Sequence, residues 1–80
     1  MTRTEIERKV TEFLVETLEI DSNLIKPDAS LKEDIGLSSL DVAEIRLFIL
    51  NTFGWQPTYE DMLSVSTMDD LISVIEQHLS

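Results

Sequence analysis

Apolar residues recur every three or four positions in three separate stretches of this chain, and no stretch alternates apolar and polar residues as a half-buried strand would. The first stretch predicts a helix from about Glu5 to about Leu18, with Thr4 and Glu7 forming a capping box at its start. The apolar face of this helix consists of Ile6, Val10, Phe13, Leu14 and Leu18. The pattern restricts the chain to an all-helical fold.

The middle stretch predicts a helix from Ser39 to about Phe53, and this helix carries two apolar stripes. The stripe expected to face the core consists of Val42, Ile45, Ile49 and Phe53. The neighbouring stripe consists of Leu40, Ala43, Leu47 and Leu50. Two interpretations of the neighbouring stripe stay open. Either a central helix of a small bundle is buried on most sides, or the stripe is a docking face for a partner.

Short polar signals mark the remaining helices. Gly54 is placed to end the central helix, and Thr58 to cap a short helix from Tyr59 to about Leu63. Thr67, with Asp70 three residues later, predicts the start of the last helix. The apolar face of the last helix consists of Met68, Leu71, Ile72, Ile75 and Leu79.

A loop of roughly 18 residues, from Glu19 to Leu37, joins the first two long helices, which is long for a compact domain. Pro27 excludes a regular helix across it, although a short helical turn is expected near Asp21 to Ile25. Apolar residues are expected to hold the loop on the core: Ile20, Leu24, Ile25, Leu31 and Ile35. The sequence thus predicts a single domain over residues 1–80, a small four-helix bundle with three longer helices, a short third helix and a long first loop.

The charge balance limits the partners that this chain can take. Sixteen acidic residues against six basic residues give a net charge of -10, which disfavours nucleic acid and anionic membrane surfaces and favours electropositive proteins. The chain has no cysteine, so it has neither a thiolate nucleophile nor a cysteine metal site. No apolar run is long enough for a signal peptide or a membrane span, and we expect a cytoplasmic monomer.

A loop containing Gly36 leads to two adjacent serines at the start of the central helix. With Ser38 as the N-cap, its side chain accepts from the backbone N–H of Asp41, and the Asp41 carboxylate reaches back to Ser38 as in a capping box. Ser39 is then the first helical residue, with a free hydroxyl. Unpaired N–H groups and the helix dipole favour an anion at this end. We therefore expect a phosphate group on Ser39, with Ser38 as the alternative attachment point.

These residues resemble the site of the acyl carrier proteins and related peptidyl carriers, whose modified serine lies in the motif Gly-x-Asp-Ser-Leu-(Asp). The corresponding residues here read Gly36-Leu37-Ser38-Ser39-Leu40-Asp41. The approach to the site is similar to that of the family as well, and it reads Ala29-Ser30-Leu31-Lys32-Glu33-Asp34-Ile35-Gly36. The helix order fits the family over essentially the whole chain.

The resemblance implies that Ser39 carries phosphopantetheine, attached by a phosphopantetheinyl transferase that uses coenzyme A and magnesium. The cargo would be an acyl group held as a thioester and presented to enzymes of a fatty-acid, polyketide or specialised pathway. An aminoacyl or peptidyl cargo on the same serine is the near alternative. The alternative from another class is an unmodified helical module for protein–protein interaction, in which the serines only cap the helix.

The resemblance also implies that loading ligases and downstream synthases or transferases dock on the central helix through basic patches with an apolar centre. The matching positions are Asp34, Leu40, Asp41, Glu44 and Leu47. Met62 and Leu63 are expected to line an acyl cavity beside the third helix. Three features depart from the typical fatty-acid carrier and indicate a specialised member with its own partners: Ser38 in place of aspartate, Arg46 at a usually apolar position, and the non-acidic Leu50-Asn51-Thr52.

No residue set predicts catalysis. His78 is the only histidine and lies near the end of the last helix, where a partial positive charge complements the helix dipole. Two interpretations of Trp55 are open, an anchor at an interface or half-buried packing, and a lone tryptophan in a small domain favours the second. We therefore expect neither an enzyme nor a metal site.

Overall fold

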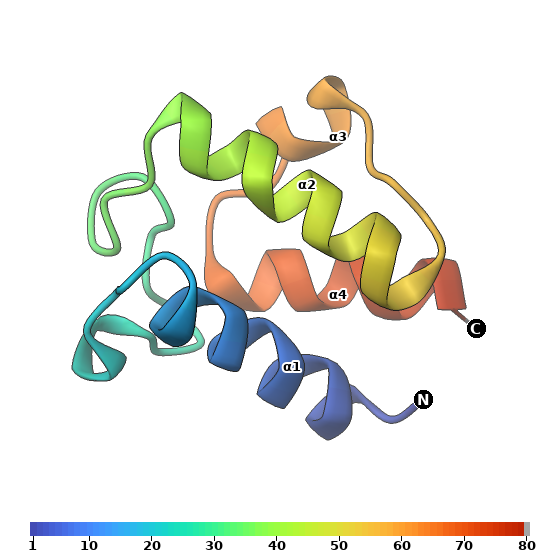
Figure 1. Ribbon diagram of the computed structural model, residues 1–80, viewed down its shortest axis with the longest axis horizontal. Coiled ribbons are helices and arrows are strands. Elements are labelled where there is room, and N and C mark those ends of the chain that lie inside the picture. Colours follow the sequence, from blue (N-terminus) through green and yellow to red (C-terminus); the bar gives the residue numbers. More distant parts are fainter. Residues whose placement is uncertain (80) are drawn as a thin grey trace.

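The computed structural model describes residues 1–79. Its elements are α1 (Arg3–Glu16), the 3₁₀ turn η1 (Ser22–Leu24), α2 (Ser39–Phe53), α3 (Tyr59–Leu63) and α4 (Met68–Leu79) (Figure 1). Over these residues the chain forms no strand, and its one β-type pairing is an isolated bridge between Ser30 and Thr67. The predicted all-helical bundle, with a long first loop and a short third helix, is confirmed.

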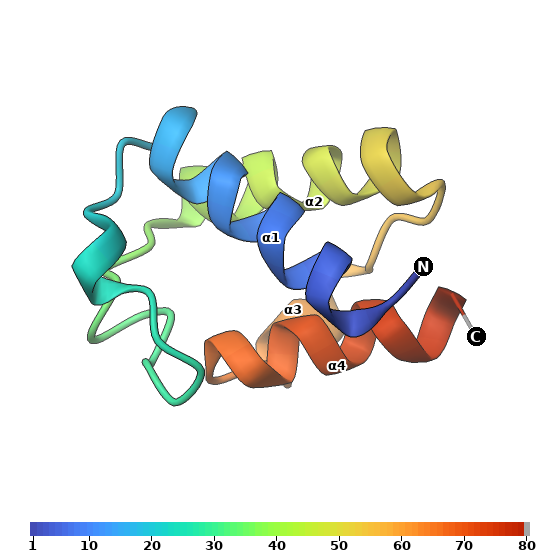
Figure 2. The ribbon, with the colours of Figure 1, turned by 90° about the horizontal axis from the view of Figure 1, so that it is seen from below.

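Three long helices enclose the core, and α1 packs along α4 with α2 lying across them (Figures 1 and 2). The short α3 lies on the opposite side of α2 from α1 (Figure 1). The core is built from one stripe of each long helix, together with Met62 of α3 and four loop residues. Its members are Ile6, Val10, Leu14, Ala29, Leu31, Ile35, Leu37, Ile45, Ile49, Met62, Met68, Leu71, Ile72 and Ile75.

The start of α1 differs from the predicted one. The helix begins at Arg3, and the N-cap is Thr2, whose Oγ1 accepts from the backbone N–H of Glu5 at 3.2 Å. The predicted capping box of Thr4 and Glu7 is therefore wrong. Thr2 with Glu5 and Thr4 with Glu7 have the same spacing, so the local sequence pattern allows the helix to begin after either threonine.

A contact between helices stabilises the extra first turn. The Arg3 guanidinium forms ion pairs with Asp69 and, at 3.1 Å, with Glu76, and it donates a hydrogen bond to Ser73 at 3.1 Å. The hydrogen bond to the Asp69 carboxylate raises the pKa of Arg3. Because all three partners lie on α4, this contact ties the first turn of α1 to α4.

The end of α1 also differs, since the helix stops at Glu16 rather than near Leu18. Glu19 adopts a left-handed backbone conformation with φ of 57°. The N–H of Ile20 then donates to the carbonyl of Leu14 at 3.0 Å, which turns the chain away from the helix axis. A left-handed residue cannot continue a right-handed helix.

The apolar residues that hold the first loop on the core differ in part from the predicted ones. Leu31 and Ile35 are buried as predicted, and Ile20 and Ile25 are half-buried. The prediction for Leu24 is wrong, because its side chain is 45% exposed. Leu24 lies in η1, where a side-chain cap organises the turn and no residue is buried. Two further loop residues that were not expected in the core are buried there, Ala29 and Leu37.

Backbone hydrogen bonds attach the second half of this loop to the start of α4. The N–H of Leu31 donates to the carbonyl of Ser66 at 2.9 Å, and the N–H of Met68 donates to the carbonyl of Ala29 at 3.0 Å. The predicted cap of α4 is present, since Thr67 Oγ1 accepts from the N–H of Asp70 at 3.1 Å. The loop is therefore fixed before it reaches α2.

Candidate functional site

The start of α2 has the predicted cap. Ser38 Oγ accepts from the N–H of Asp41 at 3.2 Å, and Asp41 Oδ2 accepts from the N–H of Ser38 at 3.0 Å. Ser39 is the first helical residue and is exposed, and its hydroxyl makes no hydrogen bond to the described part of the chain. Of the two serines, Ser38 is engaged in the cap and Ser39 presents an unengaged hydroxyl.

The loop before α2 aims this serine by backbone geometry. Gly36 has φ of 80°, in the left-handed region that favours glycine. On either side of it, Ile35 and Leu37 are buried, and the N–H of Leu37 donates to the carbonyl of Leu31 at 2.9 Å. The chain thus reverses between two anchored residues and delivers Ser38 to its capping position.

Asp34, predicted to contact partners, has a role within this loop. Its Oδ2 accepts from the N–H of Ser30 at 2.7 Å, and its own N–H donates to the carbonyl of Ser30 at 3.0 Å. The residue is exposed and precedes α2 rather than lying on the helix. One carboxylate oxygen therefore closes the loop.

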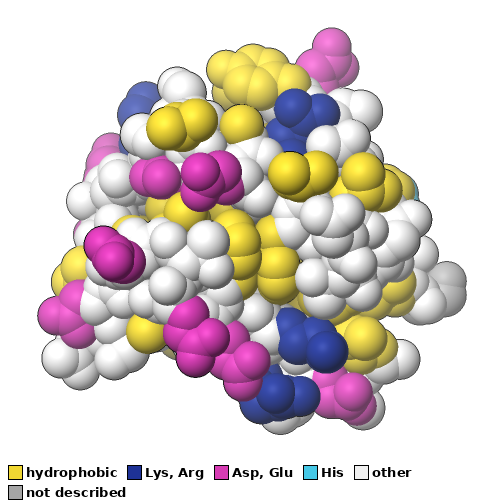
Figure 3. All heavy atoms as spheres, viewed as in Figure 1, with side chains coloured by type: hydrophobic (Ala, Val, Ile, Leu, Met, Phe, Trp, Pro, Cys, Tyr) yellow, Lys and Arg dark blue, Asp and Glu magenta, His cyan; other side chains and the backbone are white. Residues whose placement is uncertain are grey.

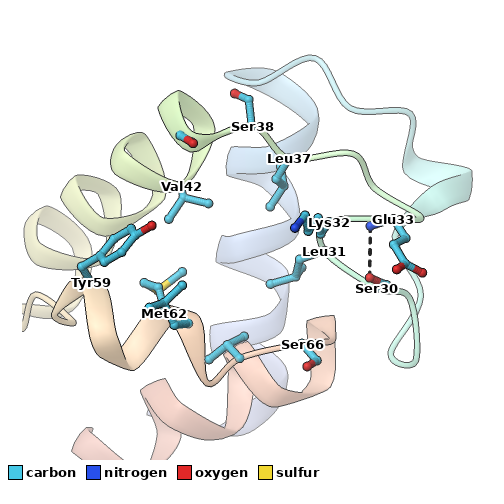
Figure 4. A pocket seen from close by; sticks show the side chains of 13 residues that line it. Ser30, Leu31, Lys32, Glu33, Leu37, Ser38, Val42, Tyr59, Met62 and Ser66 are labelled. Carbon is cyan, nitrogen blue, oxygen red and sulfur yellow. Dashed lines mark hydrogen bonds between the residues drawn. The ribbon is translucent and has the colours of Figure 1, made fainter.

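A cavity of about 420 Å³ lies beside Ser39, between α2, α3 and the loop (Figure 4). Its walls combine apolar side chains with a polar edge. The lining residues are Ser30, Leu31, Lys32, Glu33, Leu37, Ser38, Ser39, Val42, Tyr59, Met62, Leu63, Val65 and Ser66. Met62 and Leu63 both line it, as expected for a cavity at α3, although Met62 is buried and Leu63 is 67% exposed. The volume is within the range of about 300–1,000 Å³ typical of small-molecule pockets.

The second apolar stripe of α2 faces solvent. Leu40 is 70% exposed and Leu47 is 53% exposed, and Ala43 and Leu50 are exposed as well. The interpretation that α2 is buried on most sides is therefore wrong. The surface view shows hydrophobic side chains gathered over α2 with acidic side chains beside them (Figure 3).

The predicted partner residues on α2 fall into two groups. Leu40, Glu44 and Leu47 are exposed and follow one another at spacings of four and three residues, so they share one helix face. Asp41 is half-buried, and its carboxylate is used by the cap. Leu40, Glu44 and Leu47 therefore form a surface that begins next to Ser39.

The structure gives Arg46 a role that the sequence did not suggest. The Nε–H of Arg46 donates to the backbone carbonyl of Pro57 at 2.8 Å, from α2 to the segment before α3. Pro57 is almost completely buried. No local pattern signals this contact, because it joins α2 to a carbonyl 11 residues further along the chain, beyond the end of the helix.

Trp55 is half-buried, as predicted, and its ring stacks on that of His78 with a centroid distance of 3.6 Å and an interplanar angle of 14°. His78 thus packs against the chain between α2 and α3. Among residues 1–79 no cluster of histidine, cysteine or carboxylate side chains could hold a metal ion. Nor does any helix in this part of the chain have the length and apolar character needed to cross a membrane.

Comparison with protein families places the whole chain in one of them. A family model described as "Highly reducing polyketide synthase sdgA, C-terminal ACP domain", where ACP denotes acyl carrier protein, matches residues 1–80. The match spans the loop at Gly36, the serine pair and all four helices.

Proposed function

Because the chain belongs to the family of this C-terminal acyl carrier domain of a highly reducing polyketide synthase, we propose that it carries a polyketide intermediate as a thioester on phosphopantetheine attached to Ser39. The observation that carries the proposal is the exposed, unengaged Ser39 hydroxyl at the first position of α2, at the edge of the cavity. The chain presents its cargo to enzymes and catalyses nothing itself. The family match favours a polyketide cargo over a fatty-acyl, aminoacyl or peptidyl cargo.

The residues at the start of α2 fit the phosphodiester. Ser39 Oγ has no partner to give up, whereas Ser38 Oγ already accepts from Asp41. The N-terminal N–H groups and dipole of a 15-residue helix favour the phosphate charge. Phosphopantetheine bound there supplies a terminal thiol, which a chain without cysteine lacks.

Attachment requires a nucleophilic serine and a separate transferase. Ser39 Oγ attacks the phosphorus that bears the pantetheine arm of coenzyme A. A new P–O bond to Ser39 forms as the pyrophosphate bond breaks, and 3′,5′-adenosine bisphosphate leaves. The hydroxyl proton passes to a base of the transferase, and magnesium, held by the transferase, neutralises the phosphates.

We propose that the transferase and the acyl-handling enzymes dock on the face formed by Leu40, Glu44 and Leu47, with Asp34 and Asp41 near its start. The exposed leucines supply apolar contact. The net charge of -10 favours a partner surface with a basic rim and speeds encounter with it.

The test is the intact mass of the protein after incubation with coenzyme A, magnesium and a broad-specificity phosphopantetheinyl transferase. We expect a gain of one phosphopantetheinyl group on the native chain and on Ser38→Ala, and no gain on Ser39→Ala. A gain on Ser39→Ala but not on Ser38→Ala would move the site to Ser38. No gain on any of the three, with transferases of several classes, would favour an unmodified interaction module.

A further inference from the structure

The segment between α2 and α3 is fixed at two points. Trp55 stacks on His78 in the last turn of α4. Two residues later, the buried Pro57 accepts the 2.8 Å hydrogen bond from Arg46 of α2. The segment is therefore held against two different helices before α3 begins.

The position of α3 depends on this segment. The helix has only five residues, and Met62 is its one buried residue. Its cap is made by the next residue after Pro57, since Thr58 Oγ1 accepts from the N–H of Asp61 at 3.0 Å and Asp61 Oδ2 accepts from the N–H of Thr58 at 2.8 Å. A helix this short is not stable alone and takes its place from its flanks.

The hydrogen bond of Arg46 connects α2 to the segment before α3, and both helices contribute residues to the cavity. On the α2 side, Val42 lines the cavity, and Arg46 follows it by four residues on the same side of the helix. On the α3 side, Tyr59 and Met62 line it, and Figure 4 shows them across the cavity from Leu31 and Leu37. Arg46 therefore links the helix that carries Ser39 to the segment that leads into α3.

We propose that Arg46 is a positioning residue that fixes the spacing between α2 and α3 and thereby sets how much of an acyl chain the cavity encloses. The inference rests on the proposed function for the presence of an acyl cargo. Without the Nε–H of Arg46, the carbonyl of the buried Pro57 loses its partner. The wall formed by α3 then moves away from α2 more readily, and the thioester cargo is exposed to solvent for longer.

The first test needs no cargo. We expect amide hydrogen exchange at residues 59–63 of the unloaded protein to be faster in Arg46→Met than in native protein, with α1 and α4 unchanged. The matched control is Arg8→Met, which removes the same charge from an exposed residue that pairs with Glu12 inside α1. Equal exchange in Arg46→Met and Arg8→Met would overturn the inference. Because coenzyme A is absent, this test stands even if Ser39 is not modified.

The second test uses the protein loaded with butanoyl, octanoyl or dodecanoyl phosphopantetheine and measures thioester cleavage by hydroxylamine. We expect cleavage of the octanoyl form to be about three- to tenfold faster in Arg46→Met than in native protein or Arg8→Met, the range for loss of one net hydrogen bond in the closed state. The effect should be smallest for butanoyl. Equal rates in Arg46→Met and Arg8→Met, or native rates equal to that of free octanoyl-pantetheine, would overturn the inference.

Failure to load Ser39 would instead reject the proposed function and leave the exchange test to decide the role of Arg46. If Arg46→Met loses its helical circular dichroism, Arg46→Lys replaces it in both tests. The same direction is expected, because an ammonium group does not reproduce the planar Nε–H donor. Native-like exchange in a folded Arg46→Lys, together with native-like cleavage, would then contradict the proposal.

Discussion

Two neighbouring serines at the start of α2 differ in the hydrogen bonding of their hydroxyl groups, and only Ser38 has a structural role in the cap. Ser38 Oγ accepts from the N–H of Asp41, while the Ser39 hydroxyl is unengaged. The arrangement depends on Gly36, whose φ of 80° lets the chain reverse two residues before the cap. A cap within four residues and a left-handed glycine are thus sufficient to present one hydroxyl.

Gly36→Ala is expected to destabilise the protein by about 1–2 kcal/mol, the cost of a left-handed conformation for a residue with a Cβ. A Cβ at Gly36 would meet no atom within 4 Å, so the cost is in the backbone and not in packing. Urea unfolding measures it.

Gly54→Ala is the matched control, because Gly54 has φ of 77° and equally open space but ends α2 instead of preceding it. Both variants should lose similar stability, while the transferase rate on Ser39 should fall only in Gly36→Ala. Unchanged stability in Gly36→Ala would contradict the argument.

At the scale of the element, α2 divides its apolar residues between two surfaces. Ile45 and Ile49 are buried in the core, whereas Leu40 and Leu47 face solvent. One buried apolar stripe is sufficient to pack a helix onto the core. The second stripe is therefore not needed for folding. Measurements of stability can distinguish the buried stripe from the exposed one.

Ile49→Ala is expected to cost about 2–5 kcal/mol, because it leaves a cavity in the core. Leu47→Ala should change stability by no more than about 0.5 kcal/mol, since its side chain is 53% exposed. Urea unfolding tests both values, and the KM of the transferase should rise in Leu47→Ala. A large loss of stability in Leu47→Ala would place this residue in the core and remove it from the docking face.

The aspartates that cap α3 and α4 make the stability of the fold depend on pH. Hydrogen bonds from the backbone and side chain of Thr58 lower the pKa of Asp61, and hydrogen bonds from the backbone of Thr67 and Ser66 lower the pKa of Asp70. In the unfolded chain an aspartate has a pKa of about 3.9. In the folded protein the pKa values of Asp61 and Asp70 lie below this value. The two carboxylates therefore stabilise the fold fully above the unfolded pKa, and this stabilisation is lost as the pH falls through the folded pKa.

Chemical denaturation between about pH 6 and pH 2 should show this loss, with stability falling below roughly pH 4. Asp70→Asn should lower stability at neutral pH and reduce the acid dependence. Asp28→Asn, at an exposed residue of the first loop, serves as the control. If the stability of Asp70→Asn fell with decreasing pH as steeply as that of the native protein, the cap at Asp70 would not contribute to the acid dependence.

At the scale of the whole molecule, charge opposes compactness. Eighty residues support only a small core, and sixteen acidic side chains share its surface with six basic ones. The ion pairs of Arg3 and Arg8 lie at the surface, where solvent screening leaves such pairs with little effect on stability. These few pairs involve only a small part of the acidic side chains, so repulsion among the acids is left largely uncompensated.

Sodium chloride or a divalent cation is expected to raise the melting temperature, because screening relieves this repulsion. Each kcal/mol of relieved repulsion raises Tm by about 4–8 °C in a domain of this size. Differential scanning calorimetry over a salt series measures the shift. Glu44→Gln, which removes one exposed acid, should raise Tm at low salt and reduce the response to salt. A midpoint that does not move with salt would contradict the repulsion argument.

The sequence predicted features whose causes lie within a few residues of one another. The predicted capping box of Ser38 with Asp41, and the predicted cap Thr58, place the starts of α2 and α3 without reference to the rest of the chain; the structure adds Asp61 as the partner of Thr58. The same argument failed at α1, where two threonines offered equal local patterns. The helix begins after the earlier threonine, and Arg3 of its first turn pairs with Asp69 and Glu76 of α4, a contact between residues far apart in the sequence.

Tertiary structure alone decided what depends on distant neighbours. The exposure of Leu47 follows from which face of α2 the core covers, and Leu24 is exposed in a turn in which no residue is buried. The hydrogen bond from Arg46 to Pro57 and the cavity beside Ser39 likewise join elements that no local pattern brings together. By itself the sequence determined the helices, the caps of α2, α3 and α4 and the serine at the first position of α2, because hydrogen bonds over three or four residues are local. The buried faces and the walls of the cavity were decided by packing, because burial depends on every element at once.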